Sequence, residues 1–190
     1  MSAARFGAAW PAAAALLALA LGCVPGCNTS EVYSKGTGPM AFAADAPAAD
    51  APADGASVVL RSRPLEVVPR DHVIVDVVAR GAKDLHGAAF RVTWDPETLT
   101  FVEAQNAAVW SKQLIALAKE GTPGQLAVVW TEKGETSLDA TAETVLGTLT
   151  FEIKGRKSTA LAFMQERARV VDKLGAPVAV KWQGGVVAAR

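Results

Sequence analysis

The residue types that most often act as nucleophiles, general bases and metal ligands are scarce, because the chain has two histidines and two cysteines. Cys23 and Cys27 precede the part that can fold into a core, so that part has no disulfide and no thiol chemistry. His72 and His86 begin separate predicted strands without metal-site spacing. Acidic residues are scattered, and no nucleophile elbow or glycine-rich phosphate loop occurs. The sequence predicts a protein that is not an enzyme and uses no cofactor or metal.

The first 22 residues have the layout of a secretory signal, with one charge at Arg5 and then an uncharged run. The stretch "LALGC", ending at Cys23, resembles the lipobox of bacterial lipoproteins. Lipidation of Cys23 would give stable anchoring through several acyl chains. Cys27 is the competing site, although Pro25 stands where a lipobox has a small or aliphatic residue; the segment is also compatible with a Cys23–Cys27 disulfide or with an uncleaved membrane anchor. We expect export and lipid anchoring to the bacterial cell envelope, in the outer membrane or at the cell surface.

Residues 23–55 differ in composition from the rest of the chain and end in "AADAPAADAPADG". Proline favours extended backbone and aspartate keeps it solvated, which predicts a disordered, semi-rigid tether between the signal (1–22) and one folded domain (56–190). Of 19 basic and 19 acidic residues, two basic and four acidic ones precede residue 56, which leaves the domain 17 and 15. This near balance argues against nucleic acid as a partner, and we expect membrane contact only through the N-terminal lipid.

From Ser57 onward the apolar residues recur with period two, which is typical of strands with one buried face. Phe90, Val92 and Trp94 share one face, and the same rule turns Arg91 outward. The runs with this pattern lie near 57–61, 65–68, 72–80, 87–94, 98–104, 125–131, 145–154, 159–164, 167–172 and 178–188. Roughly nine or ten short strands separated by Gly, Pro and Asp predict an all-β sandwich. Residues 107–121 suit a short helix and a strand equally.

The sequence "TWDPETL" predicts a reversal of the chain after Trp94. Pro96 fixes its own φ and disfavours helical backbone at Asp95, and the Asp95 side chain can accept hydrogen bonds from amides of the turn. Trp94 is in phase with the buried residues before it, so we place it in the core.

The order of "VVPRDHVIVDVV", "TWDPETL", "GQLAVVWTEKG", "GTLTFEIKG" and "GGVV" resembles a cohesin domain over about residues 57–188. Trp94 and Arg70 stand where cohesins usually have Tyr and Gly. The resemblance implies a nine-stranded sandwich with jelly-roll topology, related to certain cellulose-binding modules, that binds dockerin domains in polysaccharide-degrading assemblies. It also implies an apolar contact at Val129 and an acid at Glu132, whereas Gly87 and Ala89 replace the Asn and Asp that dockerin-binding cohesins often present.

The hypothesis that follows is a non-catalytic, surface-anchored module that binds a dockerin-like protein partner. Its predicted partner face consists of Ala89, Arg91, Ala127, Val129 and Glu132, with Arg91 as the best candidate for a hot spot.

A different hypothesis is direct binding of a polysaccharide, which needs exposed planar aromatic rings that stack on sugars. Trp110 and Trp182 are the candidates for that platform. A third hypothesis is a structural domain of an envelope assembly, without a soluble ligand.

Overall fold

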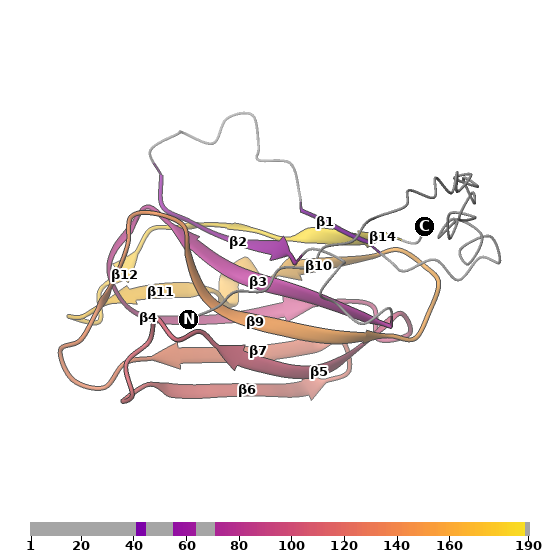
Figure 1. Cartoon of the computed structure of the whole chain (residues 1–190), viewed down its shortest axis with the longest axis horizontal. Coiled ribbons are helices and arrows are strands. Elements are labelled where there is room, and N and C mark those ends of the chain that lie inside the picture. Colours follow the sequence, from indigo (N-terminus) through magenta and orange to yellow (C-terminus); the bar gives the residue numbers. More distant parts are fainter. Residues whose placement is uncertain (1–40, 45–54, 64–70, 189–190) are drawn as a thin grey trace, which may run out of the picture.

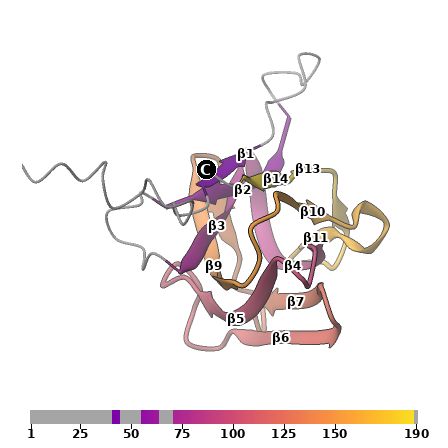
Figure 2. The same cartoon turned by 90° about the vertical axis from the view of Figure 1, so that its right-hand side faces the viewer.

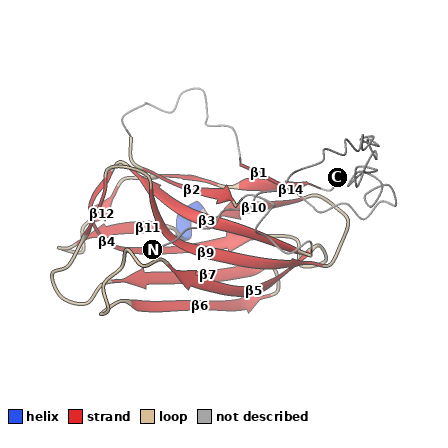
Figure 3. Ribbon diagram, in the orientation of Figure 1, coloured by secondary structure: helices blue, strands red, loops and turns tan. Residues whose placement is uncertain are grey.

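The computed structural model describes residues 41–44, 55–63 and 71–188, and it consists of two β-sheets packed face to face (Figures 1 and 3). One sheet has five strands in the order β13-β2-β3-β9-β5. The other has nine strands, with the path β1-β14-β10-β4-β11-β12 and with β6, β7 and β8 beside it. The predicted all-β sandwich is therefore confirmed.

The five-stranded sheet contains β2 (Ser57–Ser62), β3 (His72–Arg80), β5 (Leu99–Asn106), β9 (Thr144–Ile153) and β13 (Lys181–Gln183). The nine-stranded sheet contains β1 (Ala41–Ala44), β4 (Ala82–Thr93), β6 (Ile115–Thr122), β7 (Gln125–Thr131), β8 (Leu138–Ala140), β10 (Thr159–Phe163), β11 (Arg169–Asp172), β12 (Pro177–Val178) and β14 (Gly185–Ala188). A 3₁₀ turn, η3 (Gln165–Arg167), joins β10 to β11. The described residues thus form more strands than the sequence predicts, because several of them are too short to show a period.

Strand β4 is the centre of the nine-stranded sheet. One of its edges pairs with β10 and then β11, and the other pairs with β7 and then β8. Strand β6 pairs with β7 and forms the outer edge of this sheet, while β5 forms the edge of the other. Figure 2 shows both edge strands at the same side of the sandwich, at the bottom of that view.

The core lies between the sheets and is built by the predicted alternation. Phe90, Val92 and Trp94 are buried, and so is Trp130 on the neighbouring strand β7, where it pairs with Ala88. The Phe90 ring packs edge-on against Trp130, with ring centroids 5.5 Å apart. Gly147 on β9 accommodates Trp130, because a Cβ at residue 147 would lie 2.4 Å from its ring.

The reversal after Trp94 has the predicted basis. The Asp95 Oδ1 atom accepts a hydrogen bond from the backbone N–H of Glu97 at 2.9 Å. The buried Trp94 indole donates through Nε1 to the carbonyl of Leu99 at 2.9 Å. The corner therefore places Trp94 in the core and returns the chain into β5.

Residues 107–121 begin as turns and continue as strand β6, so the strand interpretation holds there. Within the predicted tether, Ala41–Ala44 form β1, which pairs antiparallel with β14. The sandwich therefore receives one strand from a segment that we expected to remain unstructured. The predicted run 178–188 forms three short strands instead of one.

Several predictions lie outside the described residues: the signal (1–22), both cysteines, most of the tether and the strand at 65–68. In the part of the chain that the structure describes, we find no helix long and apolar enough to cross a membrane.

Candidate functional site

The outward side of the nine-stranded sheet contains four of the five residues predicted to meet a partner. Pairing registers arrange this side in rows that run from β11 through β4 and β7 to β6. We define the outer face as three such rows: Val171–Gly87–Thr131–Ile115, Arg169–Ala89–Val129–Leu117 and, from β4 onward, Arg91–Ala127–Lys119. The structure therefore brings Ala89, Arg91, Ala127 and Val129 together, as predicted.

The outer face exposes apolar side chains where β6 and β7 meet. Leu117 is 56% exposed and Ile115 is 45% exposed, although both are paired in regular register with residues of β7. Val129 lies directly opposite Leu117 and is partly exposed. We call Ile115, Leu117 and Val129 the apolar strip. A contiguous apolar patch between polar positions is typical of a protein-binding surface. The sequence interpretation missed Ile115 and Leu117, because the period of their segment was ambiguous.

Arg91 lies beside this apolar strip, and its guanidinium is only partly held in place. Its Nη1 donates to Gln125 Oε1 at 3.3 Å, and Gln125 Nε2 in turn donates to the sulfur of Met164 at 2.9 Å. A guanidinium has five N–H donors, and the hydrogen bonds among the described residues use one of those on Arg91. The role of Arg91 as a contact residue stays a prediction.

Gly87 occupies a position at which the resemblance to cohesins implies a polar residue. A Cβ at residue 87 would lie 2.8 Å from Thr131 Oγ1 and 3.1 Å from Thr131 Cβ. The Thr131 side chain on β7 therefore occupies the space into which an Asn at residue 87 would project. The outer face therefore lacks, at residue 87, the polar side chain that the resemblance to cohesins implies.

The prediction that Glu132 contributes to the partner face is wrong. Glu132 is only 3% exposed. Its Oε1 accepts a hydrogen bond from the backbone N–H of Ser111 at 2.6 Å, and its Oε2 accepts one from the Ser111 hydroxyl. A buried carboxylate needs such donors, and here they fasten the segment before β6 to the end of β7. Glu132 is a structural residue.

The predicted aromatic platform for sugars is also wrong. Trp110 is 6% exposed, and its indole Nε1 donates to the carbonyl of Leu146 at 2.7 Å inside the sandwich. Trp182 is partly buried, with its ring centroid 4.9 Å from that of Phe163 and 5.8 Å from that of Phe90. Both rings pack against the core, so they do not form the exposed platform that stacking on a polysaccharide needs.

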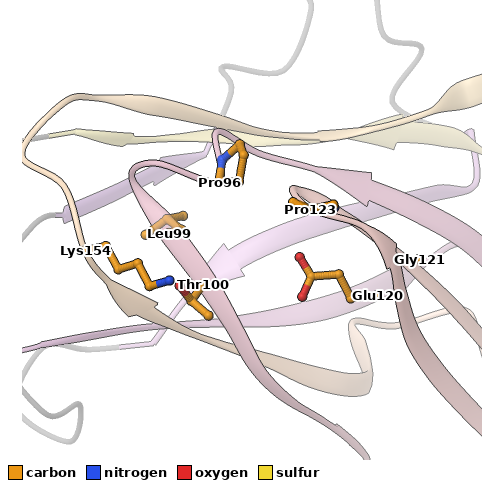
Figure 4. A pocket seen from close by; sticks show the side chains of 7 residues that line it. All are labelled: Pro96, Leu99, Thr100, Glu120, Gly121, Pro123 and Lys154. Atoms are coloured by element: carbon orange, nitrogen blue, oxygen red, sulfur yellow. The ribbon is translucent and has the colours of Figure 1, made fainter.

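A cleft of about 380 Å³ lies where the two edge strands approach the Asp-Pro corner (Figure 4). Its lining residues are Pro96, Leu99, Thr100, Glu120, Gly121, Pro123 and Lys154. Glu120 Oε1 accepts from the N–H of Gly124 at 3.1 Å, so this carboxylate belongs to the β6–β7 turn. The cleft has no aromatic lining residue, so it offers no stacking surface for sugars either.

The remaining polar candidates have local partners. His86 Nδ1 lies 2.6 Å from the carbonyl of Thr136, and His72 Nδ1 lies 2.8 Å from Asp71 Oδ1. The side-chain hydrogen bond with His72 is the main cause that lowers the pKa of Asp71 below its ordinary value. No group of three or more His, Cys, Asp or Glu side chains in the described ranges could hold a metal ion.

No protein-family model and no curated protein matches the sequence. Solved structures do match. The sixth cohesin of scaffoldin B from Acetivibrio cellulolyticus, solved with a Cel5 dockerin mutant, has 19% identity and a TM-score of 0.58, covering 70% of this chain and 99% of its own. The OlpA cohesin from Clostridium thermocellum, in complex with Doc918, has 13% identity and a TM-score of 0.56, covering 72% and 99%.

A non-cellulosomal cohesin from the archaeon Archaeoglobus fulgidus has 12% identity and a TM-score of 0.53, covering 69% of this chain and 88% of its own. These likenesses cover nearly the whole of each cohesin, and at such low identity they establish the fold alone. The described sandwich therefore has the fold of cohesin domains.

Proposed function

We propose that this chain is a non-catalytic module whose outer face binds a dockerin-type protein partner at the bacterial cell envelope. The cohesin fold supports this proposal, because two of the similar cohesins were solved with dockerins. A polysaccharide-degrading assembly is the setting that the resemblance implies. Direct polysaccharide binding loses its basis with the burial of Trp110 and the packing of Trp182.

The observation that carries the proposal is the exposure of Leu117 and Ile115 in a regular strand. An outward strand position on a solvated sheet is normally polar. Exposing two large aliphatic side chains side by side with Val129 is costly unless another molecule covers them. The strip runs across two paired strands of a sheet, which fits an extended protein surface better than a small ligand.

The test is titration of the full chain against a panel of calcium-loaded dockerin modules, beside sedimentation with insoluble cellulose, chitin and xylan. We expect saturable dockerin binding that Leu117→Asp weakens more than tenfold, because a carboxylate would be buried without a partner. The matched control is Leu174→Asp, since Leu174 is 84% exposed in the turn after β11. Equal effects of the two substitutions, or retention on a polysaccharide without any dockerin binding, would refute the proposal.

Anchoring is the second part of the proposal. Cys23 carries the lipid in this view, so Cys23→Ser should move the protein from the membrane to the soluble fraction of the cell. Cys27→Ser is the matched control and should leave the partition unchanged. Unchanged membrane partition in the Cys23→Ser variant would remove the lipid anchor from the proposal.

A further inference from the structure

The outer face has a charge pattern that indicates the chemistry of its partner. Its three outward cations are Arg91 on β4, Lys119 on β6 and Arg169 on β11. No acidic residue occupies a position in the three rows that these described strands form. Some exposed cations elsewhere in the described chain form ion pairs with acidic residues. Arg61 and Arg80, for example, both pair with Glu143. The outer face is therefore locally basic on a chain of zero net charge.

The cations border the apolar strip on two sides. Arg169 and Leu117 lie at opposite ends of one row, three strand spacings or about 14 Å apart. Arg91 and Lys119 occupy the adjacent row, two residues or about 7 Å along their strands from Ala89 and Leu117. This is the arrangement of a protein interface, with an apolar centre and a charged rim.

These cations are available to a ligand. Arg91 uses one of its N–H donors in a hydrogen bond to the neutral side chain of Gln125. Within the described chain, neither Lys119 nor Arg169 forms an ion pair, and their side chains make no hydrogen bond. Guanidinium groups bind carboxylates through paired hydrogen bonds, which makes Arg91 and Arg169 the stronger recognition elements.

We infer that the partner presents an apolar residue flanked by carboxylates, and that its acidic rim meets Arg91, Arg169 and Lys119. This inference rests on the proposed function and specifies the chemistry of the partner. A second copy of this chain is a poor occupant, because a two-fold interface would bring the same cations together. Leu117 and Arg91 are about 12 Å apart by strand geometry, which is the rise of about eight helical residues. A helix with an apolar residue and a carboxylate two turns apart would reach both.

The experiment uses the full chain and one calcium-loaded dockerin module that binds it, in three versions. The three versions differ in the dockerin residues that flank its apolar contact with Leu117. These residues lie on a helix, outside the calcium loops, and are made acidic, neutral or basic. We expect the acidic version to bind about tenfold more tightly than the neutral one at low salt, and the basic version most weakly. At about 1 M salt the three affinities should converge to within about twofold, because exposed charges are then screened.

Charge reversal on this chain completes the test. Arg91→Glu combined with Arg169→Glu should reverse the order of the three affinities, so that the basic version of the dockerin binds best. The control, Arg156→Glu with Lys157→Glu, makes the same change of net charge in the turn after β9, where Lys157 lies 4.0 Å from Glu97 and neither residue belongs to the three rows. It should preserve the order of the three affinities. If the double variant unfolds, Arg169→Glu alone suffices, since that side chain is exposed and has no partner to lose within the described residues.

The outcomes separate the two proposals. Equal binding of the three versions at low salt, or an order that charge reversal leaves unchanged, would overturn the acidic-partner inference and leave the binding face in place. If no dockerin version binds at any salt concentration, the proposed function falls, and this inference falls with it.

Discussion

Replacing Glu132 by alanine tests the view that this carboxylate is structural. The substitution removes two charge-assisted hydrogen bonds from Ser111, one from its backbone N–H and one from its hydroxyl. Each such bond contributes about 1.5–3 kcal/mol to stability. These values already include the cost of removing the groups from water, and half-buried Ser111 can bond to water instead, which places the loss at or just below the lower end of the sum. The net effect should be a loss of about 2–3 kcal/mol in the free energy of unfolding.

Urea denaturation of the full chain, followed by tryptophan fluorescence, measures this loss. In a domain of this size the same loss lowers the melting temperature by roughly 4–12 °C. The control is Glu135→Ala, in the same loop, where the side chain is exposed and makes no ion pair in the described structure. Amide hydrogen exchange should also become faster in β6, because β7 is its one partner among the described strands and Ser111 fastens its approach.

If the free energy of unfolding of Glu132→Ala lies within about 0.5 kcal/mol of that of the unmodified chain, as is usual for a surface substitution, the structural role is refuted. The same result combined with weaker dockerin binding would return Glu132 to the partner face.

Two further predictions concern packing and pH. Gly147→Ala should destabilise the domain by about 3 kcal/mol or more, as measured by urea denaturation. The reason is that the new Cβ would lie 2.4 Å from the Trp130 ring and 2.6 Å from the carbonyl of Gln105. A loss below about 1 kcal/mol would show that β9 can move away from these groups. His72→Ala should raise the pKa of Asp71 toward 3.8, which carboxyl chemical shifts in an NMR titration would report. Since the folded-state pKa of Asp71 is lowered, its ionised form favours the folded state above pH 3.8, and this contribution disappears as the pH falls through the lowered pKa. An unchanged Asp71 pKa in the variant would show that His72 is not the cause.

The strands with one buried face are predictable from sequence because their pattern is local. Phe90, Val92 and Trp94 alternate with outward residues, and the structure buries all three. The Asp95-Pro96 corner is equally local, since its hydrogen bonds join residues two to five positions apart. Strand β6 was ambiguous for a physical reason: it carries apolar residues on its outward side at Ile115 and Leu117, which obscures the period of two.

The role of Glu132 depends on a contact that local patterns do not contain. Strict alternation after Trp130 and Thr131 turns Glu132 inward, so the phase of β7 was the available signal. A carboxylate is stable there only because Ser111, 21 residues earlier, supplies two donors. Trp110 is similar, since its indole finds a carbonyl acceptor on β9, 36 residues later.

The pairing of β1 with β14 and of β2 with β13 determines how the domain would respond to tension along the chain. In the antiparallel β1–β14 pair, Ala41 lies opposite Ala188, so the chain enters β1 and leaves β14 at the same end. Pulling on the two sides would open these rungs one after another, which requires little force.

The next pair, β2 and β13, is parallel, with Ser57 opposite Lys181 and Val59 opposite Gln183. Once β14 has also separated from β10, its other neighbour, the same pull would slide β2 and β13 along each other and strain all their hydrogen bonds at once. The sandwich thus combines a strand that peels away under low load with a pair that resists shear, so tension would lengthen the segment before β2 well before it disturbs the outer face.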